Sequence, residues 1–592
     1  MIDSDRLLSD LQARVTQLRD DLRARCDADA AAHAPLLARY EAAKTSGRTA
    51  ATYNAWREDE LDQIAVAWVL ATVFVRFLED NALVETCALA GPDRAGLRRA
   101  WDAHELFFRQ NPHATEREYL LRIFEDSAKL PGMAALLDRR NNPLWTLAPS
   151  GDAAKDLLDF WRRDNPETGH PLHDFSDPDW NTRFLGDLYQ DLSAMARKRF
   201  ALLQTPDFVE QFILDRTLTP AIETFGFRTV RMIDPTCGSG HFLLGGFARL
   251  HRLWLEAAPG EVPAKLAQNA LDQVFGVDLN PNVVAIARFR LLLAALRASG
   301  TRQLRHAPDF KIHVATGDSL LHGKRFREFE GHSGPQRTFD TGEDEFRDTL
   351  KHHYEVEDKD TLHRILGQQY HAVVGNPPYI TVKDAALSKL YRDRYPSCGG
   401  KYALSVPFME RFFDLALKGD GEARPAGFVG QITANSFMKR EFGKKLIQEY
   451  IPRWDLTHVI DTSGAYIPGH GTPTVILLGK NQRPVAASIR TVLGIRGEPS
   501  TPEDPSEGVV WQAILRQVDQ GNSQSEWVSS TDSVRTKFHQ HPWNIGGGGA
   551  TGLKEQIEEA AASSVQDFAD ALGFLGITAA DEMMMATAVE FR

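Results

Sequence analysis

The loop Asn-Pro-Pro-Tyr at residues 376–379 combines residue types that can act on an amino group. It follows the apolar run 372–374, and a glycine and two prolines predict that a buried strand ends there. In an open parallel α/β sheet, ligands bind at the carboxyl ends of the strands. The Asn376 side chain and the Pro377 carbonyl can accept N–H hydrogen bonds, and the Tyr379 ring offers a flat face. This set suits a planar base with an exocyclic amino group, whereas the alternative is a proline-rich turn with a packed tyrosine.

A glycine-rich turn, Asp234-Pro-Thr-Cys-Gly-Ser-Gly240, follows the apolar strand pattern 230–233 and precedes a helical pattern. Gly238 and Gly240 remove side chains where a ligand must approach the backbone, and Asp234 can accept a hydrogen bond from an ammonium group. The spacing differs from the G-x-G-x-x-G dinucleotide fingerprint, and the sequence has no Walker loop. Alone, the turn is weak evidence for a ligand site.

Two further strand patterns end near acidic residues. The pattern 274–278 ends in Asp278, which is placed to accept hydrogen bonds from ribose hydroxyls or to cap the next helix. The pattern 311–315 is followed by Asp318 and Ser319. The glycine turn, the two acids and the Asn-Pro-Pro-Tyr loop thus follow predicted strands in that order along the chain.

These motifs resemble those of amino-group methyltransferases that use S-adenosylmethionine, most closely the enzymes that methylate N6 of adenine in DNA. Asn-Pro-Pro-Tyr looks like their catalytic motif, Asp-Pro-x-Cys-Gly-Ser-Gly-x-Phe looks like their cofactor loop, and Thr205-Pro206 looks like their first motif. The order of the motifs matches the γ arrangement. The resemblance implies the catalytic residues Asn376, Pro377, Pro378 and Tyr379. It implies cofactor contacts by Thr205, Asp234, Pro235, Thr236, Cys237, Gly238, Gly240, Asp278, Leu279, Asp318, Ser319 and Asn376.

The resemblance also suggests individual roles. Thr205 would lie against the methionine carboxylate, unless it caps the following helix, and Asp318 would accept from the adenine amino group of the cofactor. Leu279 or Leu320 would pack on the adenine ring. A second surface for the target base would come from the region of Tyr466 or Ile467, while His470 between two glycines is interpreted as a turn residue. No metal is expected, because a sulfonium already activates the methyl group.

The patterns around the motifs predict an α/β fold: a Rossmann-like class I methyltransferase core with a mostly parallel seven-stranded sheet, preceded by an all-helical domain. We expect the helical domain at residues 1–180 and the core at 181–485, with residues 322–369 as a polar insertion. The last strands should be 456–460 and 474–478, joined as a hairpin. Residues 486–592 should form a linker and the start of a C-terminal specificity-type region.

Heptad-like spacing at the start of the chain predicts a long helix, capped by Ser4 or Asp5, with an apolar stripe of Leu8, Leu11, Val15, Leu18 and Leu22. We expect this stripe to pack within the chain. The apolar run 64–75 is too short to span a bilayer and predicts a buried helix. A basic helix is expected at 439–450.

Composition restricts the class of protein. The 592 residues carry a net charge of −12, which argues weakly against DNA as a partner, although 197–199 and 439–445 form basic clusters. Four separated cysteines indicate neither a disulfide framework nor a zinc site and fit a reducing cytoplasm. Nothing in the sequence predicts contact with a membrane.

The helical N-terminal region, the form of the glycine loop and the layout resemble PglX-type methyltransferases of the BREX and DISARM phage-defence systems. This implies a site-specific adenine methyltransferase that marks host DNA, with double-stranded DNA bearing a flipped adenine as its partner. Other defence subunits, or a specificity domain that this chain lacks, are further expected partners. The alternatives are methylation of cytosine N4, RNA guanine or protein glutamine, or a non-catalytic subunit that binds cofactor and DNA.

Overall fold

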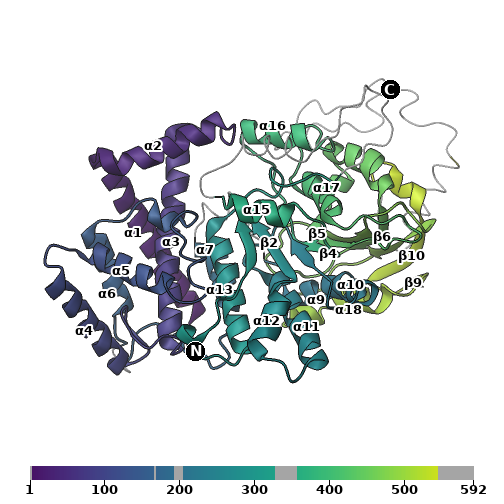
Figure 1. Cartoon of the computed structure of the whole chain (residues 1–592). Coiled ribbons are helices and arrows are strands. Elements are labelled where there is room, and N and C mark those ends of the chain that lie inside the picture. The colour runs from purple at the N-terminus through teal and green to yellow at the C-terminus, as the bar shows by residue number, and fades with distance from the viewer. Residues whose placement is uncertain (1–2, 166–168, 193–203, 327–356, 544–559, 561–592) are drawn as a thin grey trace.

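The computed structural model describes residues 3–165, 169–192, 204–326, 357–543 and 560. A helical part occupies one side of the molecule, and a large sheet with helices on both faces occupies the other (Figure 1). The predicted fold class is confirmed. The predicted basic cluster 197–199 and most of the predicted C-terminal region after residue 543 lie outside the described residues.

The helical part consists of seven helices within the described residues up to 192. They are α1 (Ser4–Ala28), α2 (Ala30–Thr45), α3 (Tyr53–Asp80), α4 (Arg94–Gln110), α5 (Glu116–Ala128), α6 (Gly151–Trp161) and α7 (Arg183–Leu192), with a short 3-10 turn η1 (Pro143–Trp145). The stripe on α1 packs against α3 and α7, so its partner lies within the chain, as expected. Two details were wrong: Leu7 rather than Leu8 is buried in the stripe, and Asp3 is the N-cap, accepting from the Arg6 amide.

Helix α3 is the core of this part. It is long and apolar enough to cross a membrane by length and composition alone, yet its apolar window is completely buried in the molecule. It also carries a buried ion pair, Arg76 Nη2 to Asp80 Oδ2 at 2.8 Å, and Arg76 donates to two backbone carbonyls. These contacts identify α3 as the buried helix predicted around residues 64–75.

The sheet-containing part begins with α9 (Asp207–Asp215) and α10 (Leu218–Phe225). It continues with β1 (Met232–Asp234), α11 (His241–Ala257), α12 (Pro263–Leu271), β2 (Val274–Asp278), α13 (Pro281–Ala298), η2 (Leu304–His306), β3 (His313–Thr316), α15 (Lys359–Leu366), β4 (Ala372–Gly375), α16 (Ala385–Arg394), α17 (Ser405–Leu415), β5 (Phe428–Ala434), η3 (Asn435–Met438), η4 (Glu441–Gly443), η5 (Leu446–Tyr450), η6 (Ile451–Arg453), β6 (Asp455–Asp461), β7 (Thr474–Lys480), β8 (Ser488–Gly494), η7 (Pro505–Glu507), α18 (Val509–Gln517), β9 (Ser523–Gln524), β10 (Val528–Val534) and η8 (Arg535–His539).

The strand order is β3-β2-β1-β4-β5-β7-β6-β8-β10-β9. Strands β3, β2, β1, β4 and β5 pair in parallel, and β7 is antiparallel to both β5 and β6. The predicted β6–β7 hairpin is therefore confirmed. From β1 the chain continues to β2 and β3 on one side, whereas β4 and β5 lie on the other side of β1. The strand order therefore reverses beside β1. Ligands of open α/β sheets bind at the carboxyl ends of the strands beside such a reversal.

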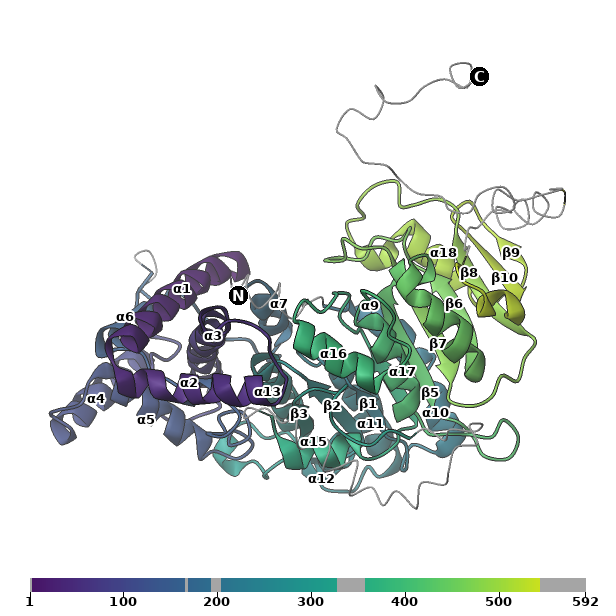
Figure 2. The same cartoon turned by 90° about the horizontal axis from the view of Figure 1, so that it is seen from above.

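Alternate residues of the strands face two apolar layers. Met232 packs with α9, α11 and α13, whereas the next residue, Ile233, packs with α15 and α17. Helix α16 lies between the helical part and α17 at one edge (Figure 2). The strands that carry the loops of the predicted site thus lie between two apolar layers.

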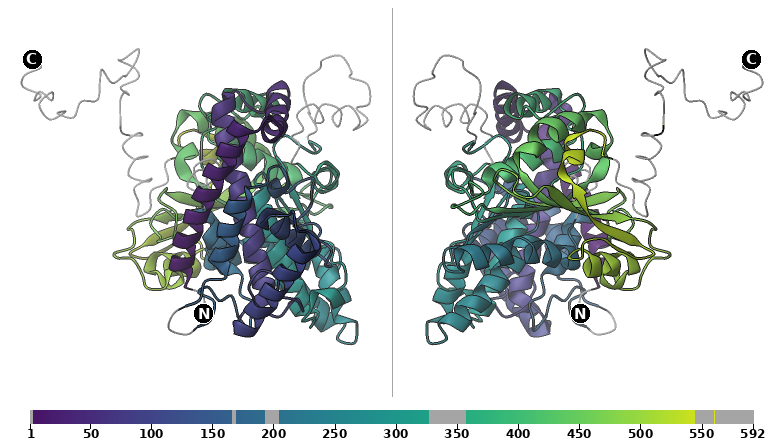
Figure 3. Two further views of the ribbon diagram at one scale, coloured as in Figure 1. Left: turned by 90° about the vertical axis from the view of Figure 1, so that its left-hand side faces the viewer. Right: turned by 90° about the vertical axis from the view of Figure 1, so that its right-hand side faces the viewer.

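The sheet does not end where the sequence predicts. Strand β8 pairs in parallel with β6, and β10 pairs with β8, so residues 474–478 are not in the last strand and the described sheet has ten strands. Figure 3, at right, shows these added yellow-green strands continuing the sheet. The sequence of β10, Val-Ser-Ser-Thr-Asp-Ser-Val, is mostly polar, so its strand depends on pairing with β8 rather than on apolar residues. The domain limits at 180 and 485 remain predictions.

Two smaller expectations also change. The polar segment 322–369 contains the helix α15, which packs against β3. The predicted basic helix at 439–450 is instead a series of 3-10 and π turns, η4 and η5. A Cβ on Gly443 would lie 1.8 Å from the Phe437 carbonyl oxygen, which shows how tightly this chain segment folds back on itself.

Candidate active site

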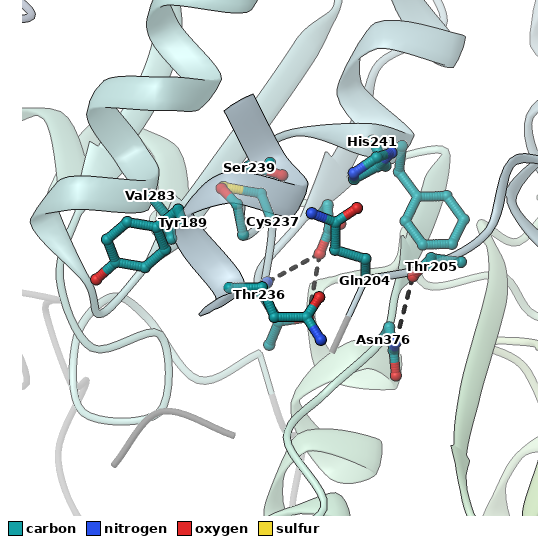
Figure 4. A pocket seen from close by; sticks show the side chains of 14 residues that line it. Tyr189, Gln204, Thr205, Thr236, Cys237, Ser239, His241, Val283 and Asn376 are labelled. Carbon is teal, nitrogen blue, oxygen red and sulfur yellow. Dashed lines mark hydrogen bonds between the residues drawn. The ribbon is translucent and has the colours of Figure 1, made fainter. Parts of the chain in front are cut away.

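Four loops lie at the carboxyl edge of the neighbouring strands β3, β2, β1 and β4. They are the glycine turn 234–240, the pair 278–279, the pair 318–319 and the Asn-Pro-Pro-Tyr loop 376–379. A small cavity, partly open to solvent, lies against two of these loops (Figure 4). It is lined by Gly186, Tyr189, Gln190, Gln204, Thr205, Asp234, Thr236, Cys237, Gly238, Ser239, His241, Phe242, Val283 and Asn376.

The glycine turn needs its glycines for two reasons. Gly238 and Gly240 have φ of +50° and +87°, a region that side chains disfavour. A Cβ on Gly240 would also lie 3.1 Å from the Ala287 side chain, whereas a Cβ on Gly238 would meet nothing within 4 Å. Gly238 therefore leaves open space for a ligand at the cavity wall, and Gly240 begins α11.

Asp234 lies buried at the base of the turn. Its Oδ1 accepts from the Thr236 amide at 2.9 Å and from the Thr236 hydroxyl at 3.1 Å. Burial raises the pKa of this carboxyl to about 8. A cation beside it would lower that pKa, so the cavity favours a ligand with a positive group at this end.

Asp278 supports the turn from the neighbouring strand. Its two carboxylate oxygens accept from the Gly238 amide at 3.0 Å and the Asn280 amide at 2.9 Å, and burial raises its pKa to about 6. Asn280, not Asp278, is the N-cap of α13. Leu279 beside it is 37% exposed and is available to a ligand, whereas Leu320 is fully buried.

Asp318 and Ser319 are enclosed, each 3% exposed. Oδ1 of Asp318 accepts from the amides of Leu320 and Leu321, and its Oδ2 accepts from the Tyr391 hydroxyl at 2.6 Å. The Ser319 hydroxyl donates to the Pro235 carbonyl at 2.6 Å. Ser319 thus ties the third loop to the glycine turn, and its expected cofactor contact stays a prediction.

The Asn-Pro-Pro-Tyr loop is anchored to the cavity. Nδ2 of Asn376 donates to Oγ1 of Thr205 at 3.2 Å, and Oδ1 of Asn376 accepts from the Tyr379 hydroxyl at 2.6 Å. Pro377 is buried, and Pro378 is partly buried. Pro206 rather than Thr205 is the N-cap of α9, so Thr205 does not cap this helix. The expected first motif and the expected catalytic motif are therefore in direct contact.

His470 is a residue whose position the sequence analysis missed. Its ring lies 5.8 Å from that of Tyr379 at 60°, and its Nε2 is 3.1 Å from the Gln204 carbonyl oxygen. Ile467 is buried and Tyr466 is 37% exposed. The two flanking glycines suggested a turn, and only the three-dimensional position of the β6–β7 connection brings His470 to the site.

Three potential metal-ligand residues, Asp207, Glu210 and His241, line a second hollow with ligand atoms within 4.8 Å of one another, and His241 also lines the cavity. Burial raises the pKa of Glu210 to about 8 and lowers that of His241, so burial favours the neutral form of both. Arg183 pairs with Asp207, and Arg290 lines the same hollow. Because these arginines already balance the acidic charge, we assign no metal to this group.

Comparison with known proteins agrees with this geometry. Residues 272–466 match the family described as Eco57I restriction-modification methylase. These residues are therefore similar to an Eco57I-type methylase domain. This domain includes Asp278, Asp318 and the loop 376–379, and the glycine turn and Thr205 precede the matched residues.

Similarity extends beyond the Eco57I-type domain. The chain is 48% identical to the adenine-specific methyltransferase PglX of Streptomyces coelicolor over 609 residues, which cover 100% of this chain and 49% of PglX. It is 27% identical to the type II methyltransferase M.PaeR7I of Pseudomonas aeruginosa, over 50% of this chain and 45% of that protein. The resemblance to PglX-type methyltransferases is confirmed, and the chain spans about half the length of these relatives.

Solved structures with related folds include the DrdV–DNA complex, with 13% identity and a TM-score of 0.48, covering 90% of this chain and 45% of that chain. Another is the type I restriction-modification methyltransferase subunit from Streptococcus thermophilus, with 14% identity and a TM-score of 0.39. That match covers 84% of this chain and 95% of the subunit. The fold described above rests on the strand order and pairing of this chain alone.

Proposed function

We propose that this chain is an S-adenosylmethionine-dependent DNA methyltransferase that modifies N6 of an adenine swung out of the duplex. One observation carries the proposal: Asn376, an acceptor suited to an amino group, is hydrogen-bonded to Thr205 in the same cavity as the glycine turn. The similarity to PglX favours adenine as the base. Host-DNA marking in a cytoplasmic phage-defence system is the corresponding biological role.

The residues of the cavity fit the proposed cofactor. Gly238 leaves open space at the wall, and the buried Asp234 would accept from the ammonium group of the methionine moiety. Asp278 would accept from the ribose hydroxyls, and the exposed face of Leu279 would pack on the adenine ring. When bound, S-adenosylmethionine supplies a methyl group that its sulfonium already activates.

The catalytic loop would then position the target base. Oδ1 of Asn376 and the Pro377 carbonyl accept the two amino hydrogens, which localises the lone pair on nitrogen and stabilises the positive charge that develops there. The Tyr379 hydroxyl donates to Oδ1 of Asn376, and the ring of His470 lies 5.8 Å from that of Tyr379. The reaction needs positioning rather than a strong base. The amino nitrogen can therefore lose its proton to water after the methyl group has been transferred.

Exposed lysines and arginines follow the strands that lead to this edge. Lys383 and Lys389 come after β4, and Lys439 and Arg440 come after β5. Because β4 and β5 are parallel, both groups start from the same edge as the catalytic loop. We propose that they contact DNA phosphates, which position the duplex but carry no sequence information.

This surface makes a prediction about binding. Residues 1–592 alone should bind DNA weakly, with strong salt dependence and little sequence preference, because specific recognition would need a further domain or subunit. The double variant Lys439→Ala, Arg440→Ala should reduce the slope of log affinity against log salt by up to about two. Fluorescence anisotropy over a salt series measures this. Tight, salt-resistant binding to one short sequence would contradict the assignment.

The test of function is transfer of tritiated methyl from S-adenosylmethionine to DNA, RNA and protein, followed by nucleoside mass spectrometry. The proposal expects N6-methyladenine in DNA. N4-methylcytosine, methylated RNA guanine or methylated protein glutamine would each identify one of the alternative substrates. Cofactor and DNA binding without transfer, even after a specificity subunit is added, would identify a non-catalytic subunit.

A further inference from the structure

A segment of the helical part reaches the sheet edge beside the third strand-end loop. The connection between α2 and α3 begins at Gly47, whose φ of +69° turns the chain after α2. The Thr49 hydroxyl and the Ala50 amide both donate to Oδ2 of Asp384, at 3.0 and 2.7 Å. Oδ1 of Asp384 caps α16, so this connection is fastened to the start of that helix. The end of α2 lies beside α16 in Figures 1 and 2.

The residue carried inward by this segment is Arg48. Its side chain is 7% exposed, with Nη2 2.9 Å from Oε1 of Glu357 and 3.8 Å from Oδ2 of Asp318. Burial lowers the pKa of the Arg48 guanidinium, but Glu357 and Asp318 raise it overall above its ordinary value. Arg48 is therefore a charged group held between two acidic side chains.

Glu357 links the same cluster to the backbone. Its Oε1 accepts from the Asp318 amide at 3.1 Å, and its Oε2 is 2.8 Å from Nε2 of His322. Tyr391 of α16 donates to Asp318 from a third direction. The Asp318 carboxylate is thus oriented by groups from α16, from its own turn and from the helical part.

We propose that Arg48 is a positioning residue that keeps the Asp318 carboxylate oriented to accept from the 6-amino group of an adenosyl cofactor. This rests on the proposed function, since it assumes that the cofactor's adenine is received at the third loop. Arg48 does not touch the cofactor and acts through Asp318. The helical part thereby contributes directly to the selectivity of the cofactor site.

The physical reason is the charge of the cluster. Without Arg48, Asp318 and Glu357 would be two acidic groups that share one enclosed site with no cation between them, and their repulsion would displace the Asp318 carboxylate. A displaced Asp318 is a poorer acceptor for an amino group. Loss of the Arg48 guanidinium should therefore weaken the binding of ligands that carry the 6-amino group and leave the rest of the binding site intact.

The experiment compares two ligands on each variant by calorimetry: S-adenosylhomocysteine and S-inosylhomocysteine, which has a 6-oxo group in place of the 6-amino group. The wild-type chain should prefer the adenosyl ligand by about tenfold or more, as expected for a hydrogen bond to a charged group. Arg48→Gln should remove most of this preference by weakening the adenosyl ligand alone. Arg48→Lys, which keeps the positive charge, should restore part of it.

The matched control is Arg39→Gln. Arg39 forms an equally enclosed ion pair with Glu60, at 3.0 Å, but wholly within the helical part. The substitution Arg39→Gln should lower the melting temperature and leave the preference for the adenosyl ligand unchanged. If Arg48→Gln does not fold, Asp384→Ala releases the Thr49–Ala50 anchor and should reduce the preference to a smaller extent.

The outcomes separate the two proposals. If the wild-type chain binds neither ligand, the proposed function fails. If it binds the adenosyl ligand selectively but Arg48→Gln keeps that selectivity, or weakens both ligands equally, Arg48 is merely structural and the inference fails. The same conclusion follows if Arg48→Gln does not fold and Asp384→Ala leaves the preference unchanged.

Discussion

The two ends of the candidate cofactor site are built from the same kind of strand-end loop but differ in what surrounds them. At the glycine turn, Gly238 faces open space and the cavity reaches Asn376. At the third loop, Asp318 and Ser319 are enclosed and already hydrogen-bonded. The first end is shaped by local sequence, whereas the second is completed by Tyr391 and Arg48 from distant segments. Chemistry and selectivity are therefore expected to respond to different mutations.

The largest effect is expected at the open end. Asn376→Ala removes an acceptor that matters most when charge develops on the amino nitrogen, so methyl transfer should fall by about a hundredfold or more. Cofactor affinity should stay near that of the wild type, measured by calorimetry beside the tritium assay. Tyr379→Phe, which keeps the ring, is the control and should lose far less. Surviving activity in Asn376→Ala would make the loop structural.

A smaller loss is expected between the two ends, at Asp278. Asp278→Ala should weaken S-adenosylmethionine binding by about 1–3 kcal/mol, because it removes a charged acceptor and leaves the Gly238 amide unpaired. Asp272→Ala is the matched control, since Asp272 is an exposed acid just before the same strand. Unchanged affinity in the Asp278 variant would remove this residue from the site.

The open end should also respond to pH through Asp234. Its folded pKa of about 8 lies above the ordinary carboxyl value, so the folded chain holds a proton that the unfolded chain has lost, and Asp234 lowers stability as pH rises toward 8. An ammonium ligand prefers the ionised carboxylate, so cofactor affinity should increase as pH rises from about 6 to 8. Calorimetry across this range measures the change. Asp234→Asn should flatten the profile, and an identical profile in that variant would exclude Asp234 as its source.

The smallest effect on binding is expected at the enclosed end. Ser319→Ala leaves the Pro235 carbonyl without its donor and should lower the free energy of unfolding by about 1–2 kcal/mol. Cofactor affinity should change by less than about threefold, because the hydroxyl faces the protein. Denaturant unfolding and calorimetry give the two values. A tenfold loss of affinity would instead support the direct cofactor contact predicted for Ser319.

The sequence predicts best where local physics decides the structure. Strand β2 was predicted with its observed limits, because an apolar run ends at an acid that cannot continue into the core. The glycine turn was equally clear, since its left-handed residues require glycine. Long-range pairing was harder to predict. Strand β10 is polar and forms a strand only beside β8, so no local pattern could identify it.

The site shows the same division. Asn376 and Asp278 could be found because motifs mark them, but their contacts with Thr205 and Gly238 depend on loops far apart in the chain. Arg48 lies in a short connection that carries no recognisable motif. His470 lies between glycines that suggest a turn, and its ring contact with Tyr379 depends on where the connection between β6 and β7 lies in the fold.

If a base enters as proposed, the short hydrogen bond from the Tyr379 hydroxyl to Asn376 would make its insertion an exchange of partners. A base that donates from an amino group replaces the donor that Oδ1 already has, so the number of satisfied acceptors is unchanged. A base with a carbonyl at that position would set two acceptors face to face and leave Oδ1 unpaired, at a cost of about 1–3 kcal/mol. An incoming base would therefore replace the Tyr379 hydroxyl on Asn376 only where it offers a hydrogen-bond donor that is at least as good.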